Sequence, residues 1–186
     1  LPTGSATTAV PTTGAAAGTA SCVLTATDAA GNQATKTLSV GITLPTLTAS
    51  ITPAGPFQTG QSFTLNLAAS NYTSLAMACT GAKSQPSLPI APGSYTYPLD
   101  LTWVGTTTRT ITAADAGGNT ASKSVSVSVT GPTLSASLNS TSLLAGQTLT
   151  LTTNTTNATS LVLNCTGAVP VVNEPLAVGS NQVRSF

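Results

Sequence analysis

Cysteine is the residue type whose spacing could decide the chemistry of this chain. The three cysteines are Cys22, Cys79 and Cys165. None belongs to a C-x-x-C motif and the sequence has no histidine, so the ligand pattern of a structural zinc site is missing. Disulfide formation in an oxidising compartment is the chemistry that remains open to them.

Acidic residues are the second reactive group, and the chain has four of them: Asp28, Asp100, Asp115 and Glu174. General acid–base catalysis needs a histidine or a pair of carboxylates at a suitable spacing, and the sequence offers neither. A calcium site also needs more oxygen ligands than these isolated acids supply. We therefore predict no enzymatic activity, no metal site and no cofactor.

Two of the acids begin turns of the form D-x-x-G-N, which lie 87 positions apart. In residues 22–44 and 109–131, each turn joins two segments in which apolar and hydroxyl-bearing side chains alternate. A period of two predicts β-strands, and glycine and asparagine supply the positive φ angles of a tight reversal. Both segments are therefore predicted to be β-hairpins. The turn residues are Asp28, Gly31, Asn32, Asp115, Gly118 and Asn119.

The same offset extends beyond the hairpins. Pro45-Thr46-Leu47 matches Pro132-Thr133-Leu134, and after the loss of one residue Cys79-Thr80-Gly81-Ala82 matches Cys165-Thr166-Gly167-Ala168. Self-similarity at a fixed period is typical of a tandem array. We predict the C-terminal half of a repeat in residues 1–44, a complete repeat in 45–131 and the N-terminal half of a third in 132–186.

A half repeat leaves sheet edges and part of a core uncovered. We expect the two half repeats to be completed either by flanking chain or by a neighbouring molecule. Residues 1–13 and 173–186 cover the same phase of the repeat, so joining the two ends would leave a surplus of about one strand.

The complete repeat is predicted to be an all-β sandwich of antiparallel strands. Seven short strands alternate with turn signals, near residues 46–52, 62–68, 74–79, 86–90, 94–103, 107–114 and 120–129. The hairpin T-A-x-D-A-x-G-N and its flanking strands resemble the tandem immunoglobulin-like (Ig-like) repeats of large bacterial secreted and surface proteins. This resemblance covers essentially the whole chain. It implies a spacer, a stalk or an adhesive array.

Cys79 and Cys165 occupy one repeat position, near the end of the third strand, whereas Cys22 occupies the position of Arg109. Three arrangements fit. Some repeats bridge the third strand to the sixth, which leaves Cys79 free opposite Arg109. Alternatively, Cys22 of one molecule pairs with Cys165 of the next in a head-to-tail polymer. In the third arrangement all three cysteines are small buried hydrophobes.

The composition excludes several partners. Charged residues make up 5% of the chain and the formal net charge is +1, so the clustered basic residues that bind nucleic acid are missing. The sequence has no run of about 20 apolar residues, so we predict no direct insertion into a membrane. Solubility must come from threonine, serine and asparagine, which suits an extracellular or surface location.

We predict a structural protein that forms part of an extracellular fibre or stalk, with self-association as its main interaction. An alternative is an adhesin or a phage virion module that binds host-surface glycans or proteins. Tyr95, Tyr97 and Trp103 lack counterparts in the other repeats, so they are either core residues or a repeat-specific binding patch. A third alternative is an accessory domain of a secreted hydrolase.

Overall fold

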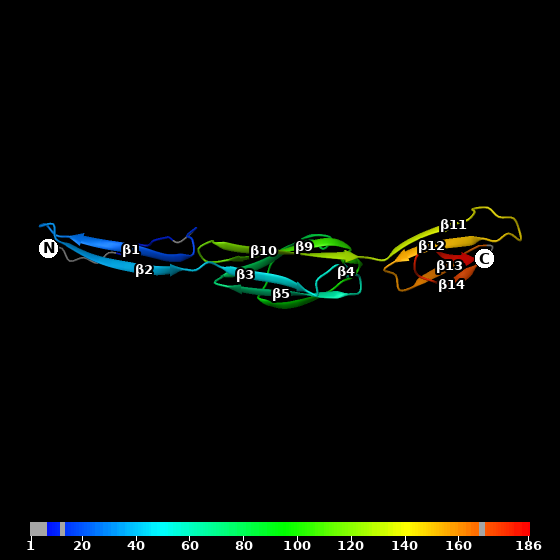
Figure 1. The fold of residues 1–186 in the computed structure, drawn as a ribbon, viewed down its shortest axis with the longest axis horizontal. Coiled ribbons are helices and arrows are strands. Elements are labelled where there is room, and N and C mark those ends of the chain that lie inside the picture. Colours follow the sequence, from blue (N-terminus) through cyan, green and yellow to red (C-terminus); the bar gives the residue numbers. More distant parts are fainter. Residues whose placement is uncertain (1–6, 12–13, 168–169) are drawn as a thin grey trace. The chain divides into compact units, whose positions relative to one another are not determined.

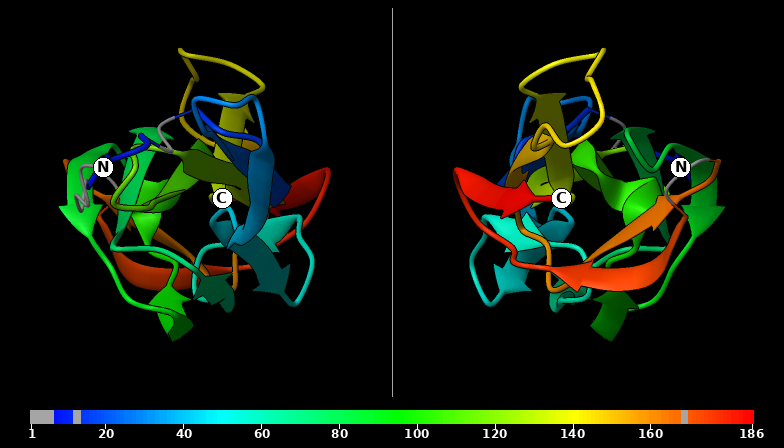
Figure 2. Two further views of the ribbon diagram at one scale, coloured as in Figure 1. Left: turned by 90° about the vertical axis from the view of Figure 1, so that its left-hand side faces the viewer. Right: turned by 90° about the vertical axis from the view of Figure 1, so that its right-hand side faces the viewer.

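The computed structural model describes residues 7–11, 14–167 and 170–186, and it is all-β (Figure 1). The described residues form five sheets and one short 3-10 helix. Figure 2 shows the same strands from the two ends of that view. The predicted all-β class is therefore confirmed, and the sheets are consistent with a β-sandwich.

The first sheet is the hairpin of β1 (Gly18–Thr27) and β2 (Gln33–Ile42), whose ten residues each pair in an unbroken antiparallel register. Cys22 lies opposite Leu38 in this register, and Ala20 lies opposite Val40. The hairpin forms where the sequence predicts it, because alternating side chains flank a turn rich in glycine and asparagine.

Residues 45–131 form two sheets. A three-stranded sheet has the order β3-β5-β8, and a five-stranded sheet has the order β4-β10-β9-β6-β7. Strand β4 pairs with β10 in parallel, whereas β6 pairs with β7 and β9 in antiparallel fashion. In chain order the strands are β3 (Thr46–Thr52), β4 (Phe57–Gln58), β5 (Ser62–Ser70), β6 (Ser74–Gly81), β7 (Gln85–Pro89), β8 (Gly93–Pro98), β9 (Gly105–Ala114) and β10 (Thr120–Thr130).

The inner and outer faces of these sheets follow the period of two. Phe63 and Leu65 of β5 and Ile111 of β9 are buried, and so is Val127 of β10. On the outer face of β9 and β10, threonine and serine hydroxyls pair across the strands at 2.9–3.4 Å. Burying β-branched and aromatic side chains on one face while pairing hydroxyls on the other is what stabilises such a sheet.

One predicted strand is shorter than expected. The strand predicted over 94–103 ends at Pro98, and a 3-10 helix follows at Leu101–Trp103. The Asp100 side chain accepts a hydrogen bond from the backbone N–H of Thr102 at 2.8 Å, which caps this helix. Proline lacks the N–H that a continuing strand would donate, so the strand stops there.

Residues 132–186 form two further sheets. One has the order β11-β12-β15 and the other is the pair β13-β14. Within the described residues, β13 pairs with β14 alone, so its second edge has no strand beside it. The strands are β11 (Thr133–Leu138), β12 (Thr150–Thr156), β13 (Leu161–Cys165), β14 (Val171–Leu176) and β15 (Gln182–Ser185).

Candidate assembly surfaces

The two D-x-x-G-N turns close by the same hydrogen bonds. In the first, the Asp28 carboxylate accepts from the backbone N–H of Ala30 and of Asn32, and from the Asn32 side chain, at 2.8–2.9 Å. In the second, the Asp115 carboxylate accepts from Gly117 and from Asn119 in the same way, at 2.9–3.0 Å. These contacts make both aspartates part of the turn architecture.

These hydrogen bonds favour the ionised carboxylate. The amide of Asn32 lowers the pKa of Asp28 below its usual value of 3.8, and the amide of Asn119 lowers the pKa of Asp115 in the same way. Gly31 and Gly118 adopt φ angles of 87° and 82°, which a residue with a side chain reaches only at a cost. All six predicted turn residues therefore belong to two equivalent turns.

A second pair of equivalent contacts lies beside the links between the predicted repeats. Asn71 and Asn157 adopt φ angles of 55° and 54°. The side chain of Asn71 donates to the carbonyl of Leu44 at 3.3 Å, and that of Asn157 donates to the carbonyl of Gly131, also at 3.3 Å. Asparagine tolerates the left-handed conformation, and its side-chain amide binds the backbone that links the predicted repeats.

Cys79 is buried, and it lies directly opposite Arg109 in the register of β6 and β9. Arg109 is itself only 2% exposed. Its guanidinium carbon lies 3.7 Å from the centroid of the Tyr97 ring and 5.4 Å from that of Phe63, and those two rings stack on each other. Cation–π contacts therefore help to hold this charge between the two sheets.

The other two cysteines have different surroundings. Cys22 is exposed on β1, and Cys165 is partly buried at the end of β13, opposite Val171. All three cysteines are free. The interpretation that they are small buried hydrophobes therefore fits Cys79 alone.

One face of the hairpin β1-β2 is largely apolar and exposed. It carries Cys22, Leu24, Leu38 and Val40, together with Lys36, which lies directly opposite Leu24. The side chains of Leu24 and Val40 are 58% and 57% exposed. The positions 87 residues later, Ile111 and Val127, are 0% and 1% exposed in β9 and β10. A sheet face of this kind is unusual on a surface that meets only water.

The two sheets of residues 132–186 enclose an open apolar groove with a volume of about 570 Å³. Its lining residues come from β11, β12 and the segment between them, from β13 and β14, and from the residue after β15. The lining residues are Leu138, Leu143, Gln147, Leu149, Leu151, Leu163, Cys165, Val171 and Phe186. Alternation in 149–151 and 161–165 is the sequence signal that could have found this groove.

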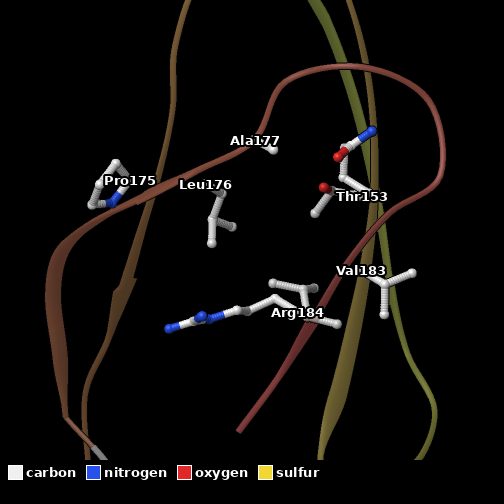
Figure 3. Close-up of a pocket in the computed structure, with 8 residues that line it drawn as sticks. Thr153, Pro175, Leu176, Ala177, Val183 and Arg184 are labelled. Carbon is white, nitrogen blue, oxygen red and sulfur yellow. The ribbon is translucent and has the colours of Figure 1, made fainter.

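A smaller cavity of about 230 Å³ lies between β12, β14 and β15 (Figure 3). The figure shows the Arg184 side chain extending below Leu176. Arg184, which lines this cavity, forms an ion pair with Glu174 of β14. The larger groove is lined by apolar residues apart from Gln147.

The three aromatic candidates do not form a shared surface patch. Trp103 is 5% exposed and belongs to the core, and Tyr97 packs against Phe63 and Arg109. Tyr95 is half-buried, and its hydroxyl donates to the carbonyl of Ala91 at 2.8 Å. Trp103 fits the core interpretation, and the binding patch of Tyr95 and Tyr97 stays a prediction.

Among the described residues, no group of histidine, cysteine or acidic side chains is arranged to hold a metal ion. In the same part of the chain, no helix has the length and apolarity to cross a membrane. The groove and the exposed face of β1-β2 are therefore the strongest candidate sites. No protein-family model matches the sequence, and no curated protein is found to be similar to it.

Proposed function

We propose that this chain is a non-enzymatic structural protein, a section of an extracellular fibre or stalk built from tandem Ig-like β-sandwiches. The observation that carries the proposal is the recurrence of elements along the chain. Strands β1 and β2 correspond in their first residues to β9 and β10 at an offset of 87, and β13 and β14 correspond to β6 and β7 at about 86.

The contacts recur with the elements. The two aspartate turns and the two linker asparagines have matching hydrogen bonds and matching φ angles. Thr46 pairs with Ser70 through their hydroxyls at 2.7 Å, and Thr133 pairs with Thr156 at 2.5 Å. Equal offsets in sequence, backbone and hydrogen bonding support one module used repeatedly.

The strand order of residues 45–131 supports an Ig-like module. In an Ig-like sandwich, the first, second and fifth strands share one sheet, and the third strand pairs with the hairpin of the last two. Here β3, β5 and β8 share a sheet, and β6 lies beside the hairpin β9-β10. Strands β4 and β7 extend the edges of the second sheet.

The composition fits an extracellular scaffold. Charged residues make up 5% of the chain, and hydroxyl pairs cover the outer face of β9-β10. With few titratable groups, such a surface keeps nearly the same charge over a wide pH range. This property suits a protein that meets an uncontrolled medium.

Electron microscopy of natively isolated protein, together with its intact mass without reduction, tests the proposal. We expect a thin filament or stalk whose subunits repeat at a spacing on the order of 35 Å, the length of a ten-residue strand. Compact isolated particles with a measurable enzymatic turnover would contradict it. The mass distinguishes a single long repeat protein from a polymer of short chains.

A further inference from the structure

We infer that the hairpin β1-β2 of one copy of this chain fills the groove of residues 132–186 in a second copy, completing an Ig-like sandwich between two molecules. The inference rests on the proposed repeat organisation, and it adds the partner, the register and the crosslink. Three observations carry it: an exposed donor face, an open acceptor groove and a template for joining them in the same chain.

The donor is the apolar face of β1-β2. Leu24 and Val40 are more than half exposed, whereas Ile111 and Val127 at the matching positions are fully buried between two sheets. Burying apolar surface contributes roughly 25 cal/mol per Å², so this face gains by being covered. Within the part of the chain that the structure describes, β1 pairs with β2 alone, so its other edge offers backbone N–H and C=O groups to a further antiparallel strand.

The acceptor is the groove between β11-β12-β15 and β13-β14. The groove residues have counterparts in residues 45–131, which we call the central sandwich. Leu143, Leu149 and Leu151 match Phe57, Phe63 and Leu65, and these three counterparts are at most 4% exposed. In the groove, Leu143 is 38% exposed and the other two are partly buried. Besides the counterparts of β11–β15, residues 45–131 contain the short strand β4 and the hairpin β9-β10, and the hairpin β1-β2 is built like β9-β10.

The central sandwich supplies the register of the joint. There, β6 pairs with β9 so that Leu75 lies opposite Ala113, Met77 opposite Ile111 and Cys79 opposite Arg109. Transferring this register to β13 of one copy and β1 of another sets three pairs opposite each other. These pairs are Leu161 with Ala26, Leu163 with Leu24, and Cys165 with Cys22.

The second edge of the hairpin, which is formed by β2, also has a neighbour in the proposed joint. Strand β10 pairs in parallel with β4, with Val129 opposite Phe57. By the same transfer, Ile42 of the donor lies beside Leu143 of the acceptor. One hairpin would therefore satisfy both the free edge of β13 and the apolar wall that includes Leu143.

The geometry brings two thiols together. Residues directly opposite each other in antiparallel strands have Cα atoms about 4.5–5.5 Å apart, within the range that a disulfide spans. A low-molecular-weight disulfide such as oxidised glutathione would be the oxidant. The Cys22 and Cys165 sulfurs form one bond and release two protons, and the two electrons convert the oxidant to two thiols.

A second copy fits the groove better than an unrelated partner. The donor and acceptor faces are both largely apolar, and β6 and β9, the repeat counterparts of β13 and β1, pair with each other in residues 45–131. Because donor and acceptor are different surfaces, the contact is heterologous and extends into chains or rings. Closure within one molecule and completion by flanking chain are the competing outcomes that the experiments must separate.

The test uses the 186-residue chain, which is purified in the reduced form and then oxidised with glutathione disulfide at increasing protein concentration. We expect multimers whose fraction rises with concentration, and a linked pair of peptides that contain Cys22 and Cys165. Mixing isotopically heavy and light protein distinguishes the two sources of that link, because only a bond between copies gives a mixed pair. Light scattering under reducing conditions measures the association without the disulfide.

Substitutions at two neighbouring residues of β1 test its two faces separately. Leu24→Lys places a second charge on the proposed docking face, opposite Lys36, and is expected to weaken self-association at least about tenfold. Val23→Lys is the matched control, because Val23 is 64% exposed on the opposite face of the same strand. It should leave association unchanged.

Complementation protects the test against variants that merely misfold. Leu163→Lys alters the groove but keeps the hairpin, whereas Leu24→Lys alters the hairpin but keeps the groove. Each variant alone should stay monomeric, and an equal mixture should form a heterodimer through one intact joint. Failure of the mixture to associate would overturn the inference.

Other results would overturn it as well: a monomer at every concentration, a Cys22–Cys165 link confined to single copies, or equal effects of Leu24→Lys and Val23→Lys. Native filaments combined with a monomeric 186-residue chain would reject the inter-copy joint and leave the proposed function standing. Multimers of the chain without any native filament would reject the proposed function instead.

Discussion

At the residue scale, a single carboxylate holds each aspartate turn closed. Asp115 accepts hydrogen bonds from two backbone N–H groups and from the Asn119 side chain, and these bonds lower its pKa below 3.8. A group whose pKa is lower in the folded state than in the unfolded state stabilises the folded state when the group is ionised. The contribution is present above about pH 4, where the carboxyl is ionised in both states, and it is lost as the pH falls through the folded-state pKa.

We therefore predict that Asp115→Asn lowers the midpoint of urea unfolding at neutral pH and that the difference from wild type shrinks in strong acid. In the variant, the amide that replaces the second carboxylate oxygen meets the Asn119 amide, so two donors face each other. Trp103 is the single tryptophan and lies in the core, so its fluorescence reports the unfolding of residues 45–131. A difference that is constant down to about pH 2 would contradict the prediction.

The pairing of Cys79 with Arg109 gives a second prediction at this scale. Arg109→Cys puts two thiols at directly opposed positions, and we expect them to form a disulfide on oxidation. Closing a loop of about 30 residues should stabilise the oxidised variant over its reduced form by about 3 kcal/mol. Non-reducing mass spectrometry and urea unfolding check both parts. Arg109→Ser is the control, since it removes the guanidinium without adding a thiol.

At the scale of elements, the two hairpins are a natural comparison, because similar sequences meet different surroundings. Val127 of β10 is buried and Val40 of β2 is 57% exposed. We predict that Val127→Ala costs about 2 kcal/mol of stability, through lost burial and a cavity. Val40→Ala should change the unfolding followed by Trp103 by less than about 0.5 kcal/mol in dilute solution. Equal costs for both substitutions would mean that β2 is already covered.

The hairpins were the elements most easily predicted, since alternation and a glycine-rich turn are local signals. Strand β4 was missed because it has two residues, and its partner, β10, lies about 70 positions away in sequence. The strand over 94–103 was predicted too long, because alternation continued past Pro98 where backbone pairing stops.

Burial of particular side chains was harder to predict than the strands. Alternation puts Arg109 on the same face as Ile111, but the run T-T-T-R-T-I does not indicate that a charged side chain is buried between the two sheets, because rings from the opposite sheet hold it there. The same holds for Trp103, which is buried from a 3-10 helix and not from a strand. Contacts between distant segments leave no local pattern.

At the scale of the whole molecule, the scarcity of charge sets how copies can attract each other. The chain has five basic and four acidic residues and a formal net charge of +1. Long-range steering between copies is therefore weak, and association must rely on apolar burial and on strand pairing. The groove is lined almost entirely by apolar side chains, which agrees with this view.

We predict that self-association of the chain responds little to sodium chloride. Raising the salt from about 0.05 M to about 0.5 M shortens the screening length severalfold, which weakens contacts between exposed charges. The dissociation constant, measured by sedimentation under reducing conditions, should change by less than about twofold, because neither proposed face depends on an ion pair. Ammonium sulfate should tighten association, since excluded salts favour apolar burial. A tenfold weakening in sodium chloride would instead assign the contact to charged residues such as Glu174 and Arg184, and Arg184→Met would then abolish the salt dependence.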